Sequence, residues 1–254
     1  MSPGGRIRDR VLSRLVQAAF LIAVLTLWHL ATTKWGVSRL LLPNPARVYD
    51  ELKDVLRSGE FVGDLRITLT EVAVAFVLSS VGGVALGFLL SRSPYLVRVF
   101  EPLLAAIYSV PIILFLPLYV LFFGLGPASK IALGATISFF PIVLNTIAGF
   151  STVERVHVVA ARSMGASDFQ LFRWVLLPGA LPVILAGLRM GFIVALLSIL
   201  GSETIASLAG LGHRIVHLAE AMDTARMFAY IAFAVAIAAT LNVIVTLMEV
   251  KGRR

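Results

Sequence analysis

The stretch Val159–Pro178 reads VAARSMGASDFQLFRWVLLP and lies between two long apolar runs. Its spacing predicts two short helices joined by a tight corner. Gly165 adopts a left-handed conformation without the steric cost that a Cβ atom brings, so it is suited to ending the first helix. Ser167 and Gln170 have the S-x-x-Q spacing of a capping box, which favours the start of the second helix. The polar composition of the segment is typical of a surface that faces water.

The two ends of this segment carry further boundary signals. Ser151 and Glu154 have the S-x-x-E spacing of a capping box, which predicts that the first helix starts there. Pro178 and Gly179 predict the end of the second helix, and Pro182 suits the first turn of the element that follows. We therefore expect a helix, a glycine corner and a helix, followed by a return into an apolar run.

The same segment resembles the EAA loop in the inner-membrane permease subunits of ABC importers. The family pattern is Glu-Ala-Ala, three residues, Gly, nine residues, Ile, one residue and Leu-Pro. Its positions after the glutamate are matched here by Ala160, Ala161, Gly165, Val175, Leu177 and Pro178. The glutamate position is Val159, which departs from the pattern. The alternative is an ordinary connection that happens to contain Ala, Gly and Pro.

The resemblance implies that this loop docks into a groove on a separate ATPase subunit and passes on the closing motion of that subunit. The loss of the glutamate places one polar contact in question but not the docking mode. The coupling residues that the resemblance implies are Val159, Ala160, Ala161, Arg162, Ser163, Met164, Gly165, Ala166, Ser167, Asp168, Phe169 and Phe172.

The composition indicates that lipid surrounds most of the chain. Of its 254 residues, 59% are hydrophobic and 14% are charged, and the mean hydropathy is +0.94. An ordinary soluble domain is about 25% charged, so a soluble protein of this composition would expose too much apolar surface. The absence of cysteine excludes disulfides, thiolate metal sites and a cysteine nucleophile. The formal net charge is +8. The basic residues flank the apolar runs, which favours a role in membrane topology over nucleic-acid binding.

Apolar runs long enough to cross a bilayer as helices divide the chain. We expect six, at about 15–31, 68–90, 99–123, 131–150, 181–200 and 227–248. The alternative for the first run is a secretory signal peptide, but its length and poor cleavage site favour a retained helix. The fold class is therefore all-α and polytopic. We predict an N-terminal part at 1–66, made of one span and an outer amphipathic helix, and a core at 67–254 with the coupling loop at 151–178.

Small residues and prolines predict how these spans pack and bend. Gly83 with Gly87, and Gly187 with Gly191, form small-xxx-small pairs that favour close helix contacts. Three prolines interrupt the third span and require it to kink, namely Pro102, Pro111 and Pro117.

The distribution of basic residues predicts the orientation in the membrane. Six spans place both termini on one side, together with the loop that contains Arg155, Arg162 and Arg173. Arginine and lysine also cluster before the first span and after the last one, whereas the opposite segments contain both signs of charge. By the positive-inside rule, the termini and the loop lie in the cytoplasm.

Further motifs resemble the nitrate, sulfonate and taurine branch of the same permeases. They include Ser109-Val110-Pro111, Phe140-Pro141-Ile142, Glu203-Thr204-Ile205 and Gly210-Leu211-Gly212. This resemblance implies the type I ABC importer permease fold in the inner membrane, a second permease copy, ATP-binding cassette ATPase subunits and a periplasmic or lipid-anchored binding protein. ATP and magnesium would be used by the ATPase, with no cofactor on this chain. The implied substrate is a small organic anion such as a sulfonate, taurine or nitrate, and the alternative is a thiamine-precursor pyrimidine or similar metabolite.

Two other classes of function are alternatives to the importer. A stand-alone channel or ion-driven carrier requires ionisable residues paired within its spans, and the spans here contain few. A membrane enzyme or scaffold has no sequence support, because neither G-x-S-x-G nor H-E-x-x-H is present. The P-loop pattern is absent as well, so the chain does not hold ATP in that way. We predict no catalytic residue.

Four residues are the candidates for a translocation pathway or its gate: Pro111, Asn145, Arg189 and Glu203. A charge at bilayer depth costs about 2.5–3.5 kcal/mol on insertion scales, so it usually faces a partner or a cavity. For Glu203, a gate role and plain solvation at a helix end both stay open. A buried structural pair is favoured for Arg189, and a hydrogen bond to a neighbouring helix for Asn145. We expect Glu71, near the end of its span, to be solvated or interfacial.

His213, His217 and Glu220 lie on one helical face at spacings typical of metal ligands. Arg214 occupies the glutamate position of H-E-x-x-H, which excludes a metalloprotease. An outer amphipathic segment that faces a binding protein is favoured, and we predict no metal site.

Overall fold

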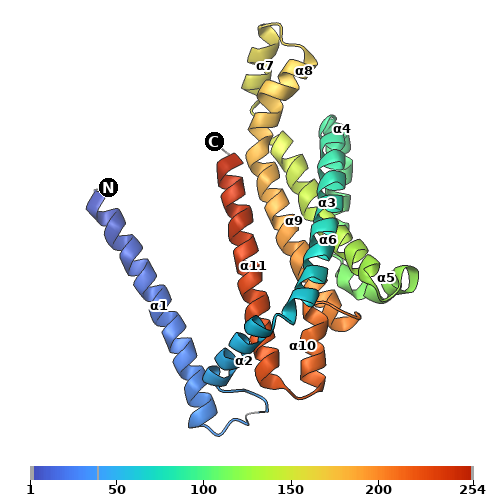
Figure 1. Ribbon diagram of the computed structural model, residues 1–254. Helices are drawn as coiled ribbons and strands as arrows, with labels where there is room; N and C mark the ends of the chain where they lie inside the picture. The colour runs from blue at the N-terminus through green and yellow to red at the C-terminus, as the bar shows by residue number, and fades with distance from the viewer. Residues whose placement is uncertain (1–2, 39, 253–254) are drawn as a thin grey trace. The chain divides into compact units, whose positions relative to one another are not determined.

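A computed structural model describes residues 3–38 and 40–252, which form helices joined by turns, without a strand (Figure 1). The all-α prediction is therefore confirmed. In chain order the elements are α1 (Pro3–Thr33), α2 (Pro45–Ser58), α3 (Phe61–Ser91), α4 (Pro94–Tyr108), η1 (Ile112–Phe115), α5 (Leu116–Phe123), α6 (Pro127–Ser151), α7 (Arg155–Ser163), α8 (Asp168–Leu171), η2 (Phe172–Leu176), α9 (Leu177–Ile205), α10 (Leu211–Glu220) and α11 (Thr224–Gly252).

Five of these segments are long and apolar enough to cross a membrane: Leu15–Thr33, Phe61–Ser91, Pro127–Ser151, Asp168–Ile205 and Thr224–Leu247. A sixth follows if α4 and the η1–α5 segment together form one broken span. These two parts are bent by 69° at the break, which contains Pro111. The predicted kink of the third span is thereby confirmed.

Contacts divide the chain into two compact units, each of which joins segments far apart in the sequence. The first unit combines the residues up to 61 with 215–233, and the second combines 62–214 with the residues from 234 onward. The division at residue 66 that we expected from composition stays a prediction.

In the first unit, α2 is defined by signals at both of its ends. The Asn44 side chain accepts a hydrogen bond from the Ala46 N–H at 2.9 Å, which caps the start of the helix. Gly59 ends the helix in the left-handed region, with φ of +69°. Val48 and Val55 are buried, so the predicted amphipathic helix is confirmed.

Side-chain contacts link other parts of the first unit to α1 and α2. The indole N–H of Trp28 on α1 donates to the Pro43 carbonyl at 3.0 Å. The Trp28 ring also lies 5.9 Å from that of Phe228 on α11. Arg226 forms an ion pair with Glu60, directly after α2. These contacts join the N-terminal segments to the beginning of α11.

In the second unit, α6 is packed between α3 and α9. A Cβ atom on Gly87 of α3 would lie 2.6 Å from Cβ of Thr146 on α6, and one on Gly191 of α9 would lie 2.5 Å from Ile142. Both distances are shorter than real side-chain contacts, so the helices approach as closely as only glycine permits. Both predicted small-xxx-small pairs face α6 in this way: Gly83 with Gly87, and Gly187 with Gly191.

The predicted capping box at Ser151 and Glu154 is wrong. Ser151 is the last residue of α6, and its hydroxyl donates to the Ile147 carbonyl at 2.9 Å. Glu154 precedes α7 without a side-chain cap. Ser151 therefore completes the last turn of α6, and α7 begins only at Arg155.

The predicted helix end at Pro178 and Gly179 is also wrong, because one helical segment continues from Asp168 to Ile205. Its residues Phe172–Leu176 form a π-helical turn, in which the Leu177 N–H donates to the Phe172 carbonyl. Pro178 follows in the first turn of α9, where a missing N–H is tolerated. The wider turn lets the chain accommodate proline without ending the helix.

Candidate functional site

The corner between α7 and α8 is a well-formed helix-ending motif. Gly165 has φ of +80°, and its N–H donates to the Arg162 carbonyl at 2.9 Å. The next N–H, of Ala166, reaches back to the Ala161 carbonyl at 3.1 Å. This pair of hydrogen bonds is the Schellman pattern, which requires a left-handed residue at the position of Gly165. The prediction that glycine ends the first helix is confirmed.

The second helix of the corner begins with the predicted capping box. The Ser167 N–H donates to the Gln170 side chain at 2.9 Å, and the Gln170 N–H donates to the Ser167 hydroxyl at 3.3 Å. Arg162 and Asp168 form an ion pair of 2.9 Å across the corner. Both partners are exposed, so this pair contributes only about 0.2–1 kcal/mol. The backbone motifs therefore define the angle of the corner.

Large apolar side chains project from this corner. Met164 is 81% exposed at the tip, Phe169 is 70% exposed on α8, and Val159 is 55% exposed on α7. Water is a poor solvent for such side chains, and an exposed apolar patch of this kind is typical of an interaction surface. The corner lies at the N-terminal end of α9, as Figure 1 shows.

The predicted coupling residues divide into an exposed set and an anchoring set. Ala161 is buried, and the Phe172 ring packs against Phe88 of α3 and Phe150 of α6, with ring centroids 5.0 and 6.4 Å apart. Phe172 therefore anchors the corner to the membrane helices. Ala166 is half-buried, and the exposed residues are Val159, Ala160, Arg162, Ser163, Met164, Gly165, Ser167, Asp168 and Phe169.

A hollow of about 530 Å³ adjoins the corner. It lies between α7 and the η2 segment, and Met164 and Trp174 contribute to its wall. Glu154 and His157 bring polar groups to the same hollow. A partner that covers the corner would therefore meet an apolar tip beside a partly polar recess.

The four predicted pathway residues do not converge. Pro111 is exposed at the bend before η1 and lines a hollow of about 420 Å³ that also contains Tyr108 and Ser198. The other three, Asn145, Arg189 and Glu203, are absent from the residues that line this hollow.

Asn145 and Arg189 lie within the helices of the second unit. The Asn145 amide donates to the Pro141 carbonyl at 2.7 Å within α6, and its Cβ faces Gly187 of α9. The amide bond therefore stays within α6, contrary to the hydrogen bond to a neighbouring helix that we favoured, and the side chain packs against α9 instead. Arg189 is half-buried on α9. Whether either residue contributes to a pathway stays a prediction.

Glu203 is only 1% exposed and is a central acceptor in a buried polar cluster. Its carboxyl group accepts a hydrogen bond from the Thr68 hydroxyl at 2.7 Å and another from the Gly212 N–H at 2.7 Å. Solvation at a helix end, one of the two alternatives, does not apply to a residue so deeply enclosed.

Two charged residues of this cluster were missed from the sequence. Glu71 is 2% exposed, so the expectation of a solvated site was wrong. Lys130 is 0% exposed, and its ammonium group donates to the carbonyls of Gly126, at 3.1 Å, and Leu125. Glu71 interacts electrostatically with both Glu203 and Lys130. The available signal was a charge inside each apolar run, which usually marks a buried partner.

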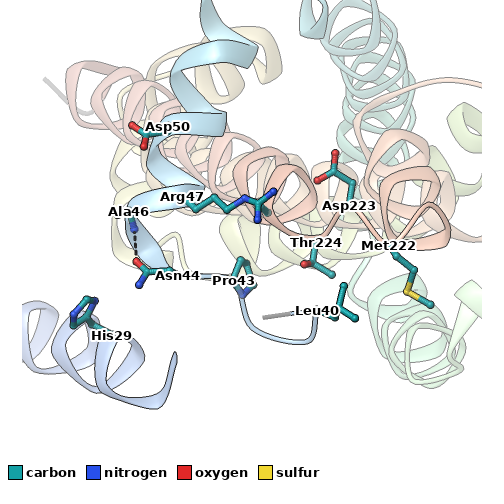
Figure 2. A pocket seen from close by; sticks show the side chains of 11 residues that line it. His29, Leu40, Pro43, Asn44, Ala46, Arg47, Asp50, Met222, Asp223 and Thr224 are labelled. Carbon is teal, nitrogen blue, oxygen red and sulfur yellow. Dashed lines mark hydrogen bonds between the residues drawn. The ribbon is translucent and has the colours of Figure 1, made fainter. Parts of the chain in front are cut away.

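A further hollow of about 500 Å³ lies in the first unit (Figure 2). It is lined by α1, the start of α2 and the turn before α11, and it combines Arg47 with Asp50 and Asp223. Opposite charges at one hollow indicate no preference for a cation or an anion. In the described part of the chain, no three His, Asp or Glu side chains are placed to hold a metal ion, and this includes His213, His217 and Glu220.

Comparison with known proteins gives consistent matches. The family model for the binding-protein-dependent transport system inner membrane component matches residues 66–250. The chain is 34% identical over 217 residues to the taurine transport system permease protein TauC of Escherichia coli strain K12, which covers 84% of this chain and 79% of that protein. It is 31% identical to the putative aliphatic sulfonates transport permease protein SsuC of Bacillus subtilis strain 168, with 97% and 88% covered.

A relative with a different named cargo matches at a similar level. The formylaminopyrimidine transport permease protein ThiX of Halalkalibacterium halodurans is 31% identical, with 76% of this chain and 77% of that protein covered. Among solved structures, an inward-facing conformation of the MetNI methionine ABC transporter matches with a TM-score of 0.64 and 20% identity. That match covers 76% of this chain and 96% of the other, and at this identity it concerns the fold.

Proposed function

This chain belongs to the inner membrane components of binding-protein-dependent transport systems, and from this membership we propose that two copies of it form the pathway of an ATP-driven importer. It is an ABC importer permease subunit. In the proposal, cytoplasmic ATPase subunits supply the energy, and a binding protein on the opposite side of the membrane delivers the substrate. ATP and magnesium belong to the ATPase.

The observation that carries this proposal is the corner at Gly165. A turn with an exposed apolar tip is suited to insertion into a groove on another protein. Binding would remove the exposed Met164 side chain from water, and the backbone of the turn already has its bound conformation, so little entropy is lost. The predicted cytoplasmic side of this corner agrees with the location of an ATPase.

The helix that follows the corner supports a mechanical link to the rest of the membrane domain. One helical segment runs from Asp168 to Ile205 and packs against α6 along glycine contacts. At about 1.5 Å per residue, α9 alone is roughly 43 Å long, which is enough to cross a bilayer. A displacement at the corner would therefore move the far end of α9 as well.

Changing Met164 to glutamate is expected to weaken the binding of the ATPase by about tenfold or more, because a charge would enter an apolar contact. The measurement is the affinity of the ATPase that copurifies with this chain from native membranes, titrated against the purified permease in nanodiscs. Leu208→Glu is the matched control, because Leu208 is 70% exposed at the other end of α9. Equal binding of both variants would contradict the docking role. Uptake by the purified chain in liposomes without any ATPase would favour a channel or carrier instead.

We propose a small sulfonate as the substrate, and the support is the match to two permeases whose names specify taurine and aliphatic sulfonates. The similar match to ThiX favours a formylaminopyrimidine as the second candidate. The pathway residues predicted from the sequence do not decide between the two, because only Arg189 bears a positive charge that could select an anion, and its place in a pathway stays a prediction.

Labelled taurine is expected to accumulate in proteoliposomes that contain the complete transporter and its copurified binding protein, in an ATP-dependent manner. A tenfold excess of an unlabelled alkanesulfonate should compete, whereas a formylaminopyrimidine should not. The matched control replaces ATP with a non-hydrolysable analogue. Competition by the pyrimidine and not by the sulfonate would reverse the assignment.

A further inference from the structure

The loop 206–212, which runs from the end of α9 into the first two residues of α10, is held by side chains from α3 and α9. The Leu211 N–H donates to the Thr68 hydroxyl oxygen of α3 at 3.0 Å. The adjacent N–H, of Gly212, donates to the Glu203 carboxyl group of α9 at 2.7 Å. The Thr68 hydroxyl in turn donates a hydrogen bond to the Glu203 carboxyl group at 2.7 Å. These three bonds form a closed triangle that joins α3, α9 and the loop, and all three are buried.

The glycines of this loop permit the triangle to form. Gly210 has φ of +108°, and a Cβ atom there would overlap the Glu203 carboxyl group. A Cβ on Gly212 would lie 2.5 Å from the Leu200 carbonyl, which belongs to the backbone and cannot move aside. The Gly210 N–H also donates to Asp64 of α3, at 3.3 Å. Three successive backbone N–H groups, those of Gly210, Leu211 and Gly212, are thus held by side chains.

A charged residue, Lys130, links this triangle to a second turn of the chain. Lys130 interacts electrostatically with Glu203, and its ammonium group donates to the Gly126 carbonyl in the turn before α6. The same cluster therefore connects the turn before α6 with the loop after α9. Both turns lie at the end of α9 that is far from the corner at Gly165.

We propose that Glu203 and Thr68 form a latch that makes the loop 206–212 move as one body with α3 and α9 during transport. This inference rests on the proposed function. In it, the corner at Gly165 receives the motion at one end of α9, and the latch passes it to the loop at the other end. Glu203 is a positioning residue, since it acts through the loop and not on the substrate.

The chemistry of Thr68 makes the latch testable without a gross change of shape. Its hydroxyl donates to Glu203 and accepts from Leu211, and it also lies 3.2 Å from the Asp64 carbonyl within α3, so Thr68→Val removes both latch bonds while keeping the volume. The Glu203 carboxyl oxygen and the Leu211 N–H would then lose this hydrogen-bond partner. We expect the equilibrium between the bound and the released loop to shift toward the released form by about tenfold or more. Thr70 is the matched control, because its hydroxyl donates only to the Arg66 carbonyl within α3 and it is exposed.

The first experiment measures the order of the loop directly. The chain contains no cysteine, so Leu208→Cys allows a single nitroxide to be attached at an exposed loop position. In the complete transporter, its electron paramagnetic resonance spectrum should show the same restricted motion with and without ATP. Thr68→Val should release the nitroxide in at least one of these states, whereas Thr68→Ser, which keeps the hydroxyl, and Thr70→Val should not.

The second experiment measures coupling in the same samples. Thr68→Val and Glu203→Gln should lower ATP-driven uptake by about tenfold, while basal ATP hydrolysis and ATPase binding stay within about twofold of the unmodified protein. Unchanged loop motion and uptake in Thr68→Val would overturn the latch and leave the importer assignment intact. Loss of ATPase binding on changing Met164 tests that assignment separately. If Thr68→Val fails to assemble, Thr68→Ser decides the test. An equal defect in Thr68→Ser, which keeps the hydroxyl, would also overturn the latch.

Discussion

Replacing Gly165 by valine is expected to reduce substrate uptake by the complete transporter at least tenfold while ATP hydrolysis continues. Gly165 has φ of +80°, and a left-handed backbone costs about 1–2 kcal/mol for a residue with a Cβ atom, more for a branched one. No atom lies within 4 Å of the added Cβ position, so the strain and not a clash would change the angle of the corner. Uptake and hydrolysis are measured together in proteoliposomes.

The control for this prediction has the same backbone strain at another place. Gly59 has φ of +69° and equally open surroundings, so Gly59→Val carries a similar local cost at the end of α2. It should leave the ratio of uptake to hydrolysis unchanged. Gly165→Asn should retain most of the uptake, because asparagine tolerates the left-handed region. Full coupling in Gly165→Val would show that the corner angle does not transmit motion.

Replacing Gly191 by leucine is expected to abolish accumulation of the folded permease in the membrane. An added Cβ would lie 2.5 Å from Ile142 of α6 and 3.2 Å from the Ser138 carbonyl, so α6 and α9 would be forced apart. Overpacking of this kind costs about 1–3 kcal/mol for a few added methylene groups, and more where the backbone has to move. The amount of monodisperse protein after detergent extraction measures the effect.

Gly201 is the matched control on the same helix. No atom lies within 4 Å of a Cβ at that position, so Gly201→Leu should accumulate normally. A second test uses the smaller change Gly191→Ala combined with Ile142→Ala, which removes the side chain in the way. The double variant should recover part of the yield that Gly191→Ala loses. Equal yields from Gly191→Leu and Gly201→Leu would contradict the close packing of α6 and α9.

Local signals predicted the corner well because its geometry depends on residues close together in the chain. Gly165 ends α7 and the Ser167–Gln170 box starts α8, as expected. The same kind of signal failed at Ser151, which is the last residue of α6 and not the cap of α7. It failed at Pro178 as well, where a π-helical turn accommodates the proline. In both cases, the packing of a long membrane helix outweighed a preference of a few residues.

The polar residues of the membrane region were harder to assign. Glu203 was recognised as a candidate, but its partner Thr68 lies 135 residues away in the sequence. Glu71 was expected to be solvated, and Lys130 was not among the candidate residues. A charge inside an apolar run indicates that a partner exists but contains no information on which residue that is.

The sequence by itself determined that this protein is a helical membrane protein with a glycine corner that ends one helix and begins the next, since composition, helix caps and left-handed glycines act over a few neighbouring residues. Only the tertiary structure decided which helices meet through the glycine pairs and that Glu203, Thr68 and the loop at Leu211 form one buried cluster. Such contacts join residues on different helices that are far apart in the sequence, and they form only when the packing of α3, α6 and α9 brings these helices together.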